Sequence, residues 1–368
     1  MGVMLHTATD RAFLASILEA PEDDAPRLIY ADWLDEQGES DRAEFIRLQV
    51  REARMAADDP ELPALRSRTR QLGLAYHVKW VNRLPYFEGV HWEIFERGFI
   101  GAARFDHPDT FFAHAAHVFA ATPIQELRLH QFNSSHAPAL AATDQLRRVR
   151  ILDLNDGNKI ANLGTEALME SRHLRNLVVL KLGRNVLGSA GVRAIAISGS
   201  VRSLKRLKLE RNDLFDDGLR YLAESRAVAG LEQLDLERTR TGDDGVKSLT
   251  KTKFLTGLRL LDLSHNQVTD AGLIALAESV VVGQLRDLFL HGNAIADAGV
   301  AALAASPHLG RLERVFLRQN RIRDEGALAL ARSPHLSHVR ELHLGENRIS
   351  DQAGDELRAR FRSRVNLY

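Results

Sequence analysis

Two histidines are the first residues of this chain whose spacing could support chemistry. His114 and His117 stand three positions apart, a separation that places two imidazoles on one face of a helix, where they could hold a metal ion. A metal site needs a third ligand, and the sequence offers none at a matching spacing. We therefore expect solvated or helix-capping histidines, and neither a metal nor any other cofactor.

A group of charged residues between positions 27 and 44 has the composition of a catalytic carboxylate site. Its members are Arg27, Asp32, Asp35, Glu36, Arg42 and Glu44. Neighbouring helices of a small domain commonly use such residues as surface ion pairs. We expect that structural use here.

The composition removes several further classes of enzyme. The chain has no cysteine, which excludes disulfides, thiolate zinc sites and cysteine nucleophiles. It also lacks the G-x-S-x-G turn of serine hydrolases and the G-x-x-x-x-G-K-[ST] loop that cradles phosphates. We therefore expect a protein that is not an enzyme.

Charge and hydropathy limit the partners and the location. Lys+Arg and Asp+Glu both number 49, and a net charge of zero argues against nucleic acid or a membrane surface as the partner. No apolar run is long enough to span a bilayer, and the segment MGVMLHTATDRAFL lacks the pattern of a signal peptide. We expect a cytoplasmic protein.

A repeat of 27 residues occupies the chain from Leu177 onward. Successive copies begin at Leu204, Leu231, Leu258, Leu285, Leu312 and Val339. In each copy an L-x-x-L-x-L segment alternates as a half-buried strand does, and a G-x-x-x-L-A-x-S segment has helical spacing. One strand and one helix cannot bury their apolar faces alone, so stacked copies must form a curved parallel sheet inside and helices outside. The sequence therefore predicts an α/β solenoid.

The pattern resembles the ribonuclease-inhibitor-like class of leucine-rich repeats, over residues 124–354 and in about nine copies. The resemblance implies that an asparagine after each strand bonds the backbone of the turn, and that a glycine opens each helix. The asparagines are Asn185, Asn212, Asn266, Asn293, Asn320 and Asn347, and the glycines are Gly191, Gly218, Gly245, Gly272, Gly299 and Gly326. Thr239 replaces one asparagine, and we expect a looser turn there because a hydroxyl satisfies fewer backbone groups.

Residues 1–50 have the pattern of a separate all-helical module. Three helical segments follow one another, with Asp10 as the expected N-cap of the first and with Pro26 and Gly38 near the two ends of the second. The module resembles the repeat-companion domain that precedes repeat arrays in many bacterial proteins, which implies a bacterial source and no particular activity. The matching residues are Pro26, Arg27, Leu28, Tyr30, Ala31, Asp32, Trp33, Leu34, Arg42, Ala43, Glu44, Phe45, Ile46 and Gln49.

The chain should therefore comprise five parts. They are the companion domain (1–50), a helical connector (51–94), an N-terminal solenoid cap (95–123), the leucine-rich repeats (124–354) and a C-terminal cap (355–368). We expect a break in the connector near Asp58–Pro63 and docking of the helical module on the N-terminal cap through its tryptophans. Leu357 and Phe361 should point inward in the C-terminal cap.

The inner sheet is the surface that says most about function. In L-x-x-L-x-L the leucines face the core, so the residue between the last two faces outward, as does the residue two positions later. These columns divide the surface into a pair of lysines, an acidic zone and an aromatic zone. They are Lys181 and Lys208, then Glu210, Asp235, Glu237 and Asp262, then Phe289, Phe316 and His343, flanked by His291 and Arg318.

Two interpretations of the adjacent, outward-facing phenylalanines stay open. They either stack across strands and steady the sheet, or form the apolar anchor of a binding site. We predict a non-catalytic recognition scaffold or adaptor that binds a protein partner on the concave face, with a monomer favoured.

Two other functions remain as alternatives. The GTPase-activating proteins of Ran use the same repeat type, and Arg184 or Arg211, at strand ends, would then act on a bound partner. The chain could instead be a proteolytically processed target in a bacterial regulatory or defence pathway, nicked near Asp58–Pro63 or Ser134–Pro138.

Overall fold

The computed structural model describes residues 8–367. They form two compact units, which divide between His130 and Gln131. The first seven residues, which belong to the segment considered for a signal peptide, lie outside the described residues. Within residues 8–367, no helix combines the length and the apolar character needed to cross a bilayer.

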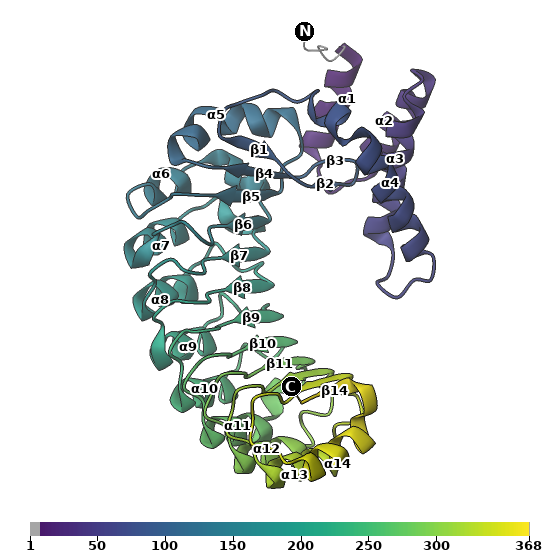
Figure 1. Cartoon of the computed structure of the whole chain (residues 1–368). Helices are drawn as coiled ribbons and strands as arrows, with labels where there is room; N and C mark the ends of the chain where they lie inside the picture. The colour runs from purple at the N-terminus through teal and green to yellow at the C-terminus, as the bar shows by residue number, and fades with distance from the viewer. Residues whose placement is uncertain (1–7, 368) are drawn as a thin grey trace. The chain divides into compact units, whose positions relative to one another are not determined.

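The first unit begins with four helices and continues with short strands and a fifth helix (Figure 1). The helices are α1 (Ala8–Glu19), α2 (Ala25–Glu36), α3 (Ser40–Arg54), α4 (Leu62–Val81) and α5 (Pro108–Ala121). The strands are β1 (Val90–Trp92), β2 (Phe95–Glu96), β3 (Phe99–Ile100), β4 (Ala102–Phe105) and β5 (Glu126–Leu129). β2 and β3 form an antiparallel hairpin, while β4 pairs antiparallel with β1 and parallel with β5. The predicted break in the connector is confirmed as the turn between α3 and α4.

Two expectations for the N-terminal helices were wrong. Arg27 and Arg42 do not lie on the surface but are buried, with exposed fractions of 3% and 9%. One aromatic ring, that of Phe99, lies near Arg27, and rings from several elements surround Arg42. The surface ion pairs do form, but Arg47 pairs with Asp32 and Asp35 at 2.6 Å each, and Arg68 pairs with Glu44 at 2.7 Å. Asp10 lies inside the first turn of α1 instead of capping it, and its carboxylate accepts a hydrogen bond from the Tyr30 hydroxyl at 2.9 Å.

The second unit is a parallel sheet with a helix or a helical turn following almost every strand. The strands are β6 (Ile151–Asp153), β7 (Val179–Lys181), β8 (Arg206–Lys208), β9 (Gln233–Asp235), β10 (Leu260–Asp262), β11 (Asp287–Phe289), β12 (Arg314–Phe316), β13 (Glu341–His343) and β14 (Val365–Asn366). The α-helices are α6 (Ala137–Ala141), α7 (Ala161–Met169), α8 (Ser189–Ile197), α9 (Phe215–Ala223), α10 (Asp243–Thr250), α11 (Asp270–Glu278), α12 (Asp297–Ala305), α13 (Asp324–Ala331) and α14 (Asp351–Phe361). The 3-10 turns are η1 (Asp144–Arg148), η2 (Leu174–Asn176), η3 (Val280–Val282) and η4 (Arg362–Arg364).

The strands of this unit follow one another across the sheet in chain order (Figure 1). They line the inner side of the unit and the helices line its outer side, so its strand face is concave. The middle leucine of each repeat strand, such as Leu234 or Leu261, is fully buried between the two layers. The predicted fold class, a leucine-rich-repeat solenoid preceded by a small helical region, is confirmed.

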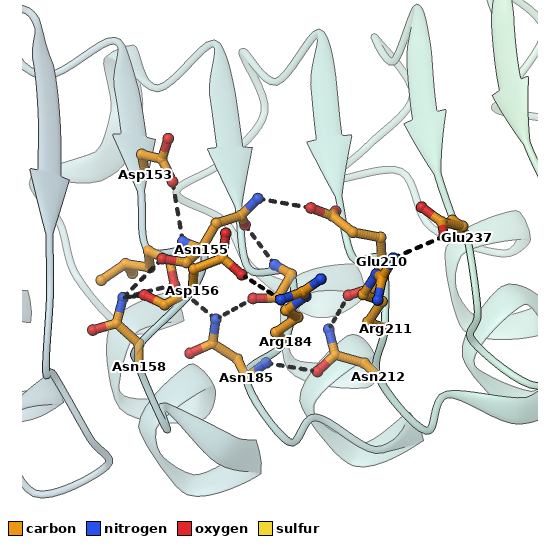
Figure 2. Close-up of polar contacts among 12 residues, drawn as sticks. Asp153, Asn155, Asp156, Asn158, Arg184, Asn185, Glu210, Arg211, Asn212 and Glu237 are labelled. Atoms are coloured by element: carbon orange, nitrogen blue, oxygen red, sulfur yellow. Dashed lines mark hydrogen bonds and ion pairs between the residues drawn. The ribbon is translucent and has the colours of Figure 1, made fainter.

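A ladder of buried asparagines holds neighbouring repeats in register. Asn185 donates through Nδ2 to the carbonyls of Leu154 and Gly183, at 2.7 and 2.9 Å, and its Oδ1 accepts from the Ile160 amide at 3.1 Å. Figure 2 shows Asn185 and the equivalent asparagine of the next repeat, Asn212, whose Oδ1 accepts from the Asn185 amide at 3.0 Å. The predicted role of these asparagines is confirmed.

Thr239 fills this position in one repeat and serves fewer partners. Its hydroxyl donates to the Leu236 carbonyl of its own repeat at 2.8 Å. The amides of Leu214 and Phe215 in the preceding repeat then bond the Thr239 backbone carbonyl, at 3.2 and 3.0 Å. Phe215 takes a left-handed φ of 55°, but Ala161 takes 52° against the Asn185 repeat, so this conformation does not depend on the threonine. The Thr239 hydroxyl thus takes over only part of the asparagine's role, while the side chain stays fully buried, and a looser turn stays a prediction.

A second ladder, formed by acidic residues on the helices, escaped the sequence analysis. Asp243 Oδ1 accepts from the amides of Thr269 and Gly272 in the next repeat, at 2.8 and 3.0 Å. The equivalent residues are Asn162, Asp216, Asp270, Asp297 and Asp324. A Cβ at Gly272 would lie 2.6 Å from Asp243 Oδ1. The repeated glycine is therefore needed for close approach between helices, because a side chain there would collide with the carboxylate that caps its helix.

The C-terminal end of the unit follows the prediction and adds a strand. α14 buries Leu357 and Phe361, as expected. The chain then turns back, and β14 pairs parallel with β13, joining Leu342 to Val365 and His343 to Asn366. This last strand was not predicted, since a strand of two residues has no detectable period.

Candidate functional site

The register of the sheet places the predicted outward residues in one column. Successive strand pairs align Lys181 with Lys208, Lys208 with Asp235, Asp235 with Asp262, Asp262 with Phe289, Phe289 with Phe316 and Phe316 with His343. The column lies on the concave face of the second unit. On each strand, the residues just before and just after the column position are buried in the core, so the column side chain points the other way. The arrangement of this surface in charged and aromatic zones is therefore real in three dimensions.

The aromatic residues at one end of the column form a continuous stack. The rings of Phe289 and Phe316 lie 4.6 Å apart between centroids, and those of Phe316 and His343 lie 4.4 Å apart, nearly parallel. The three side chains are half-buried, not openly exposed as expected, because each ring covers a face of the next. The Arg314 guanidinium, on the same strand as Phe316, lies 5.8 Å from the Phe289 ring centre. Cross-strand stacking therefore occurs, and it leaves ring edges toward solvent.

The acidic zone beside the stack contains two carboxylates that form no ion pair within residues 8–367, Glu210 and Asp262. Asp235 pairs with Lys208 at 3.3 Å, and Glu237 pairs with Arg238 and Arg211 at 3.1 and 3.4 Å. Asp262 accepts the Ser264 amide at 2.8 Å, and in residues 8–367 it has no ion pair. Burial raises the pKa of Asp262 to about 6, and the charges of Asp235 and Glu237 add to that rise.

Glu210 is held by the scaffold more firmly than the sequence suggested. Its Oε1 accepts from Asn155 Nδ2 at 2.7 Å, and Asn155 Oδ1 accepts from the Gly183 amide at 2.6 Å (Figure 2). A Cβ at Gly183 would lie 2.4 Å from Glu210 Oε1, so the glycine makes room for the carboxylate. Burial raises the pKa of Glu210. Lys181 is likewise paired with Asp153, at 2.6 Å. Glu210 and Lys181 are therefore less available to a partner.

A row of exposed arginines runs along the strand ends next to the acidic zone. Arg184, Arg211 and Arg238 occupy the same position in three consecutive repeats, each with a left-handed φ between 54° and 57°. Arg184 pairs with Asp156 at 3.4 Å, as Figure 2 shows together with the Arg211 to Glu237 contact. Arg184 and Arg211 were candidates from the sequence, but Arg238 was not, although the repeat spacing of 27 residues places it in the same column.

Two histidines, His265 and His291, lie just after strands β10 and β11, next to the aromatic zone. His291 Nδ1 and the Ser264 hydroxyl lie 2.9 Å apart, and the rings of His265 and His291 meet edge to face at 4.9 Å. His265 covers Gly292, where a Cβ would lie 2.3 Å from His265 Nδ1. Burial lowers the pKa of both histidines, so both are uncharged at neutral pH. Arg318, the other predicted flanking residue, pairs with Glu346.

The remaining candidates gather no recognisable chemistry. His114 and His117 both pack on the Phe87 ring, at 4.5 and 6.0 Å between centroids. In the part of the chain that the structure describes, no three His, Asp or Glu side chains are grouped as a metal ion would require. The two segments proposed for a proteolytic nick are turns at helix starts, and cleavage there stays a prediction.

One comparison, with a family of repeats, agrees with the architecture of the second unit. The family described as Leucine Rich repeat matches residues 173–196, 256–277, 312–331 and 335–357, all in the second unit. An internalin from Listeria monocytogenes is a similar solved structure, with 19% sequence identity and a TM-score of 0.43. The alignment covers 66% of this chain and 66% of the internalin chain, just under two thirds of its length. No curated protein matches the chain.

Proposed function

We propose that the concave face of the second unit recognises a protein partner and that the chain is a non-catalytic scaffold or adaptor. The observation that carries this proposal is the strand register that places Phe289, at the end of an aromatic stack, directly opposite Asp262, a carboxylate without an ion pair in residues 8–367. Apolar rings bordered by a charged group that can pair with the partner are typical of the residues that dominate binding energy at interfaces.

The chemistry of the surface defines the partner. A Lys or Arg side chain of the partner would pair with Asp262 and relieve its repulsion from Asp235 and Glu237. An aromatic or branched aliphatic side chain one strand spacing away would cover the edges of Phe289 and Phe316. We therefore expect an apolar anchor next to a cationic residue, in a segment that lies across the strands.

The other predicted contact residues have smaller roles in this proposal. Lys181, Lys208, Glu210 and Glu237 already have partners within the unit, so they would orient an approaching partner and speed its association more than they would add affinity. His343, His291 and Arg318 would form the rim of the aromatic zone.

The finer assignments rest on sequence resemblance. We propose that the repeats belong to the ribonuclease-inhibitor-like class, that the N-terminal helices form a repeat-companion domain, and that the source is bacterial. We also propose a cytoplasmic monomer that binds protein and not nucleic acid or membrane.

A displayed random peptide library provides a direct test, because selection from it works for a partner of any identity. Peptides selected on the full-length wild-type chain should carry Lys or Arg within a few residues of an aromatic or aliphatic anchor. The Phe289→Ala/Phe316→Ala double variant should bind these peptides more weakly by about 2–4 kcal/mol, the range of interface hot spots. Calorimetry with a synthetic peptide measures the difference.

A matched control separates binding from folding. Leu163→Ala/Ile197→Ala also removes two apolar side chains from the same unit, where both are exposed and lie on helices, and it should bind normally. The proposal fails if the aromatic double variant folds and binds as the wild type does, or if the selected peptides lack cations.

A further inference from the structure

A small cavity lies within the first unit, between the helices and the β2–β3 hairpin. Its volume is about 50 Å³. Most of its wall is apolar or aromatic, and it includes Leu14, Trp80, Phe95, Phe99 and Ile100. The charged residues of the wall are Asp10, Arg42 and Arg83, and of these Arg42 is buried.

The guanidinium of Arg42 has an unusual environment. The side chain is 9% exposed, and its Cζ lies 4.6 Å from the Trp80 ring centre, 5.2 Å from that of Phe95 and 5.6 Å from that of Phe99. Nη2 donates to the carbonyl of Gly98, while Nη1 is buried without a hydrogen-bond partner. Among residues 8–367 no carboxylate forms an ion pair with Arg42.

An unpaired cation is costly in such surroundings. Aromatic faces compensate a guanidinium in part, but a buried N–H without an acceptor loses the hydrogen bond that water would supply. Burial lowers the pKa of Arg42 to about 9, so the group still carries its charge at neutral pH. The cavity therefore presents the charge and the free Nη1 donor of Arg42, and its wall also holds the Asp10 carboxylate, which accepts from the Tyr30 hydroxyl.

The other polar groups of the wall already have partners. The Tyr30 hydroxyl donates to Asp10, and the Arg83 guanidinium pairs with Glu39 at 2.6 Å. The Thr122 hydroxyl donates to the Ile100 carbonyl at 2.7 Å. Arg42 is thus the lining residue, within the described chain, whose buried donor lacks a protein acceptor.

We propose that this cavity binds a short-chain carboxylate, whose anionic head accepts from Arg42 and whose aliphatic tail contacts the aromatic wall. Because Nη2 already donates to Gly98, a carboxylate oxygen would accept from the free Nη1, and the guanidinium charge would balance that of the carboxylate. A water needs about 10–15 Å³ by the same measure, so the space suits a group on the order of four or five non-hydrogen atoms, such as propionate. A phosphate dianion would leave one negative charge uncompensated in apolar surroundings. The proposal is independent of the concave-face function.

Arg42 also has a structural contact, which the test must respect. Its bond to Gly98 holds the β2–β3 hairpin, together with Gln49, which accepts from the Gly98 amide at 2.7 Å. Replacing Arg42 could loosen the hairpin for reasons unrelated to a ligand. Ala121 lines the same cavity at the end of α5, so Ala121→Leu fills the space and keeps the guanidinium.

The experiment is a titration of the full-length chain with sodium propionate, against sodium chloride at equal ionic strength, followed by tryptophan fluorescence. Trp80 lines the cavity and should report binding. We expect a saturating signal with propionate and at least a ten-fold weaker response to propionamide, which has the same shape without the charge. Ala121→Leu and Arg42→Gln should lose the signal, whereas Arg47→Gln, on the surface of the same helix, should keep it. Circular dichroism checks the fold of each variant.

Several results would overturn the proposal. Propionate acting no more strongly than chloride or propionamide would show that no anion site exists. Undiminished binding by folded Ala121→Leu would place the site elsewhere. Tighter binding of inorganic phosphate, or of a tripeptide with a free C-terminal carboxylate, would reject a short-chain carboxylate as the ligand class. If Arg42→Gln unfolds, the comparison of propionate binding by Ala121→Leu and by the wild type decides whether the cavity is the site.

Discussion

The two units of this protein bury polar groups in different ways. In the second unit, each buried asparagine such as Asn212 finds partners in its own repeat and in the one before, and the same arrangement recurs along the sheet. In the first unit, Arg42 is buried among aromatic rings in an arrangement that does not repeat, and its Nη1 donor has no hydrogen-bond partner. A repeating unit spreads its polar groups over many equivalent contacts, while a non-repeating unit concentrates them at a few residues. Specialised binding can then arise at an unsatisfied group in the first and along an open column of side chains in the second.

Deleting residues 1–50 should have the largest effect on stability, and it should affect the first unit and not the second. The deletion removes Ile46, which packs against Gly98, and it removes Arg42 and Gln49, which hold the hairpin. We expect residues 51–130 to lose cooperative unfolding, because Phe95 and Phe99 lose their covering helix, while the repeats still unfold cooperatively. Thermal melts followed by circular dichroism test this. An unchanged melting profile would show that the N-terminal helices contribute nothing to the fold of the remainder.

A substitution in the asparagine ladder should have the next largest effect. Asn212→Ala leaves buried backbone groups of two repeats without partners, and we expect a loss of roughly 2–4 kcal/mol in the free energy of unfolding. Thr239→Ala is the matched control, with a cost of about 1 kcal/mol, because the Thr239 hydroxyl serves fewer backbone groups. Urea denaturation measures both values. Equal costs would mean that the ladder is not what joins the repeats.

Asp262→Asn should stabilise the second unit in a pH-dependent way. The folded pKa of Asp262, about 6, lies above the ordinary value of 3.8, so the folded state binds the proton more tightly than the unfolded state does. The contribution of Asp262 to stability is therefore full below pH 4 and is lost as pH rises through 6. At pH 8 the variant should be more stable than the wild type by about 1–3 kcal/mol, with little difference at pH 4. Urea melts at the two pH values provide the test, and a gain that is equal at both would contradict it.

Removing metal ions should have the smallest effect, in both units alike. The chain has no cysteine, and the sequence offers no ligand set with metal spacing. A chelator should leave the melting curve where it is. A shift of several degrees with chelator alone would reveal a structural metal.

Much of the second unit was predictable from its sequence, because a repeat states the same constraint many times. The alternation in L-x-x-L-x-L fixed which residues lie in the outward column, and the period of 27 residues fixed that Phe289 and Phe316 would be neighbours. The role of Asn185 and its equivalents followed from the resemblance, and the partial substitute at Thr239 followed from its shorter side chain.

Other features depend on atoms brought together from distant positions, which no period in the sequence records. The reason for Gly272 becomes visible only when Asp243 of the preceding repeat is seen against it. Ring stacking made Phe289 half-buried, and the loss of solvent around Asp262, with Asp235 and Glu237 nearby, raised its pKa. Arg42 looked like a surface residue because its helix is highly charged, yet the rings that bury it come from α3, α4 and the β2–β3 hairpin. Local sequence determines which elements form, whereas burial and charge compensation depend on which elements meet.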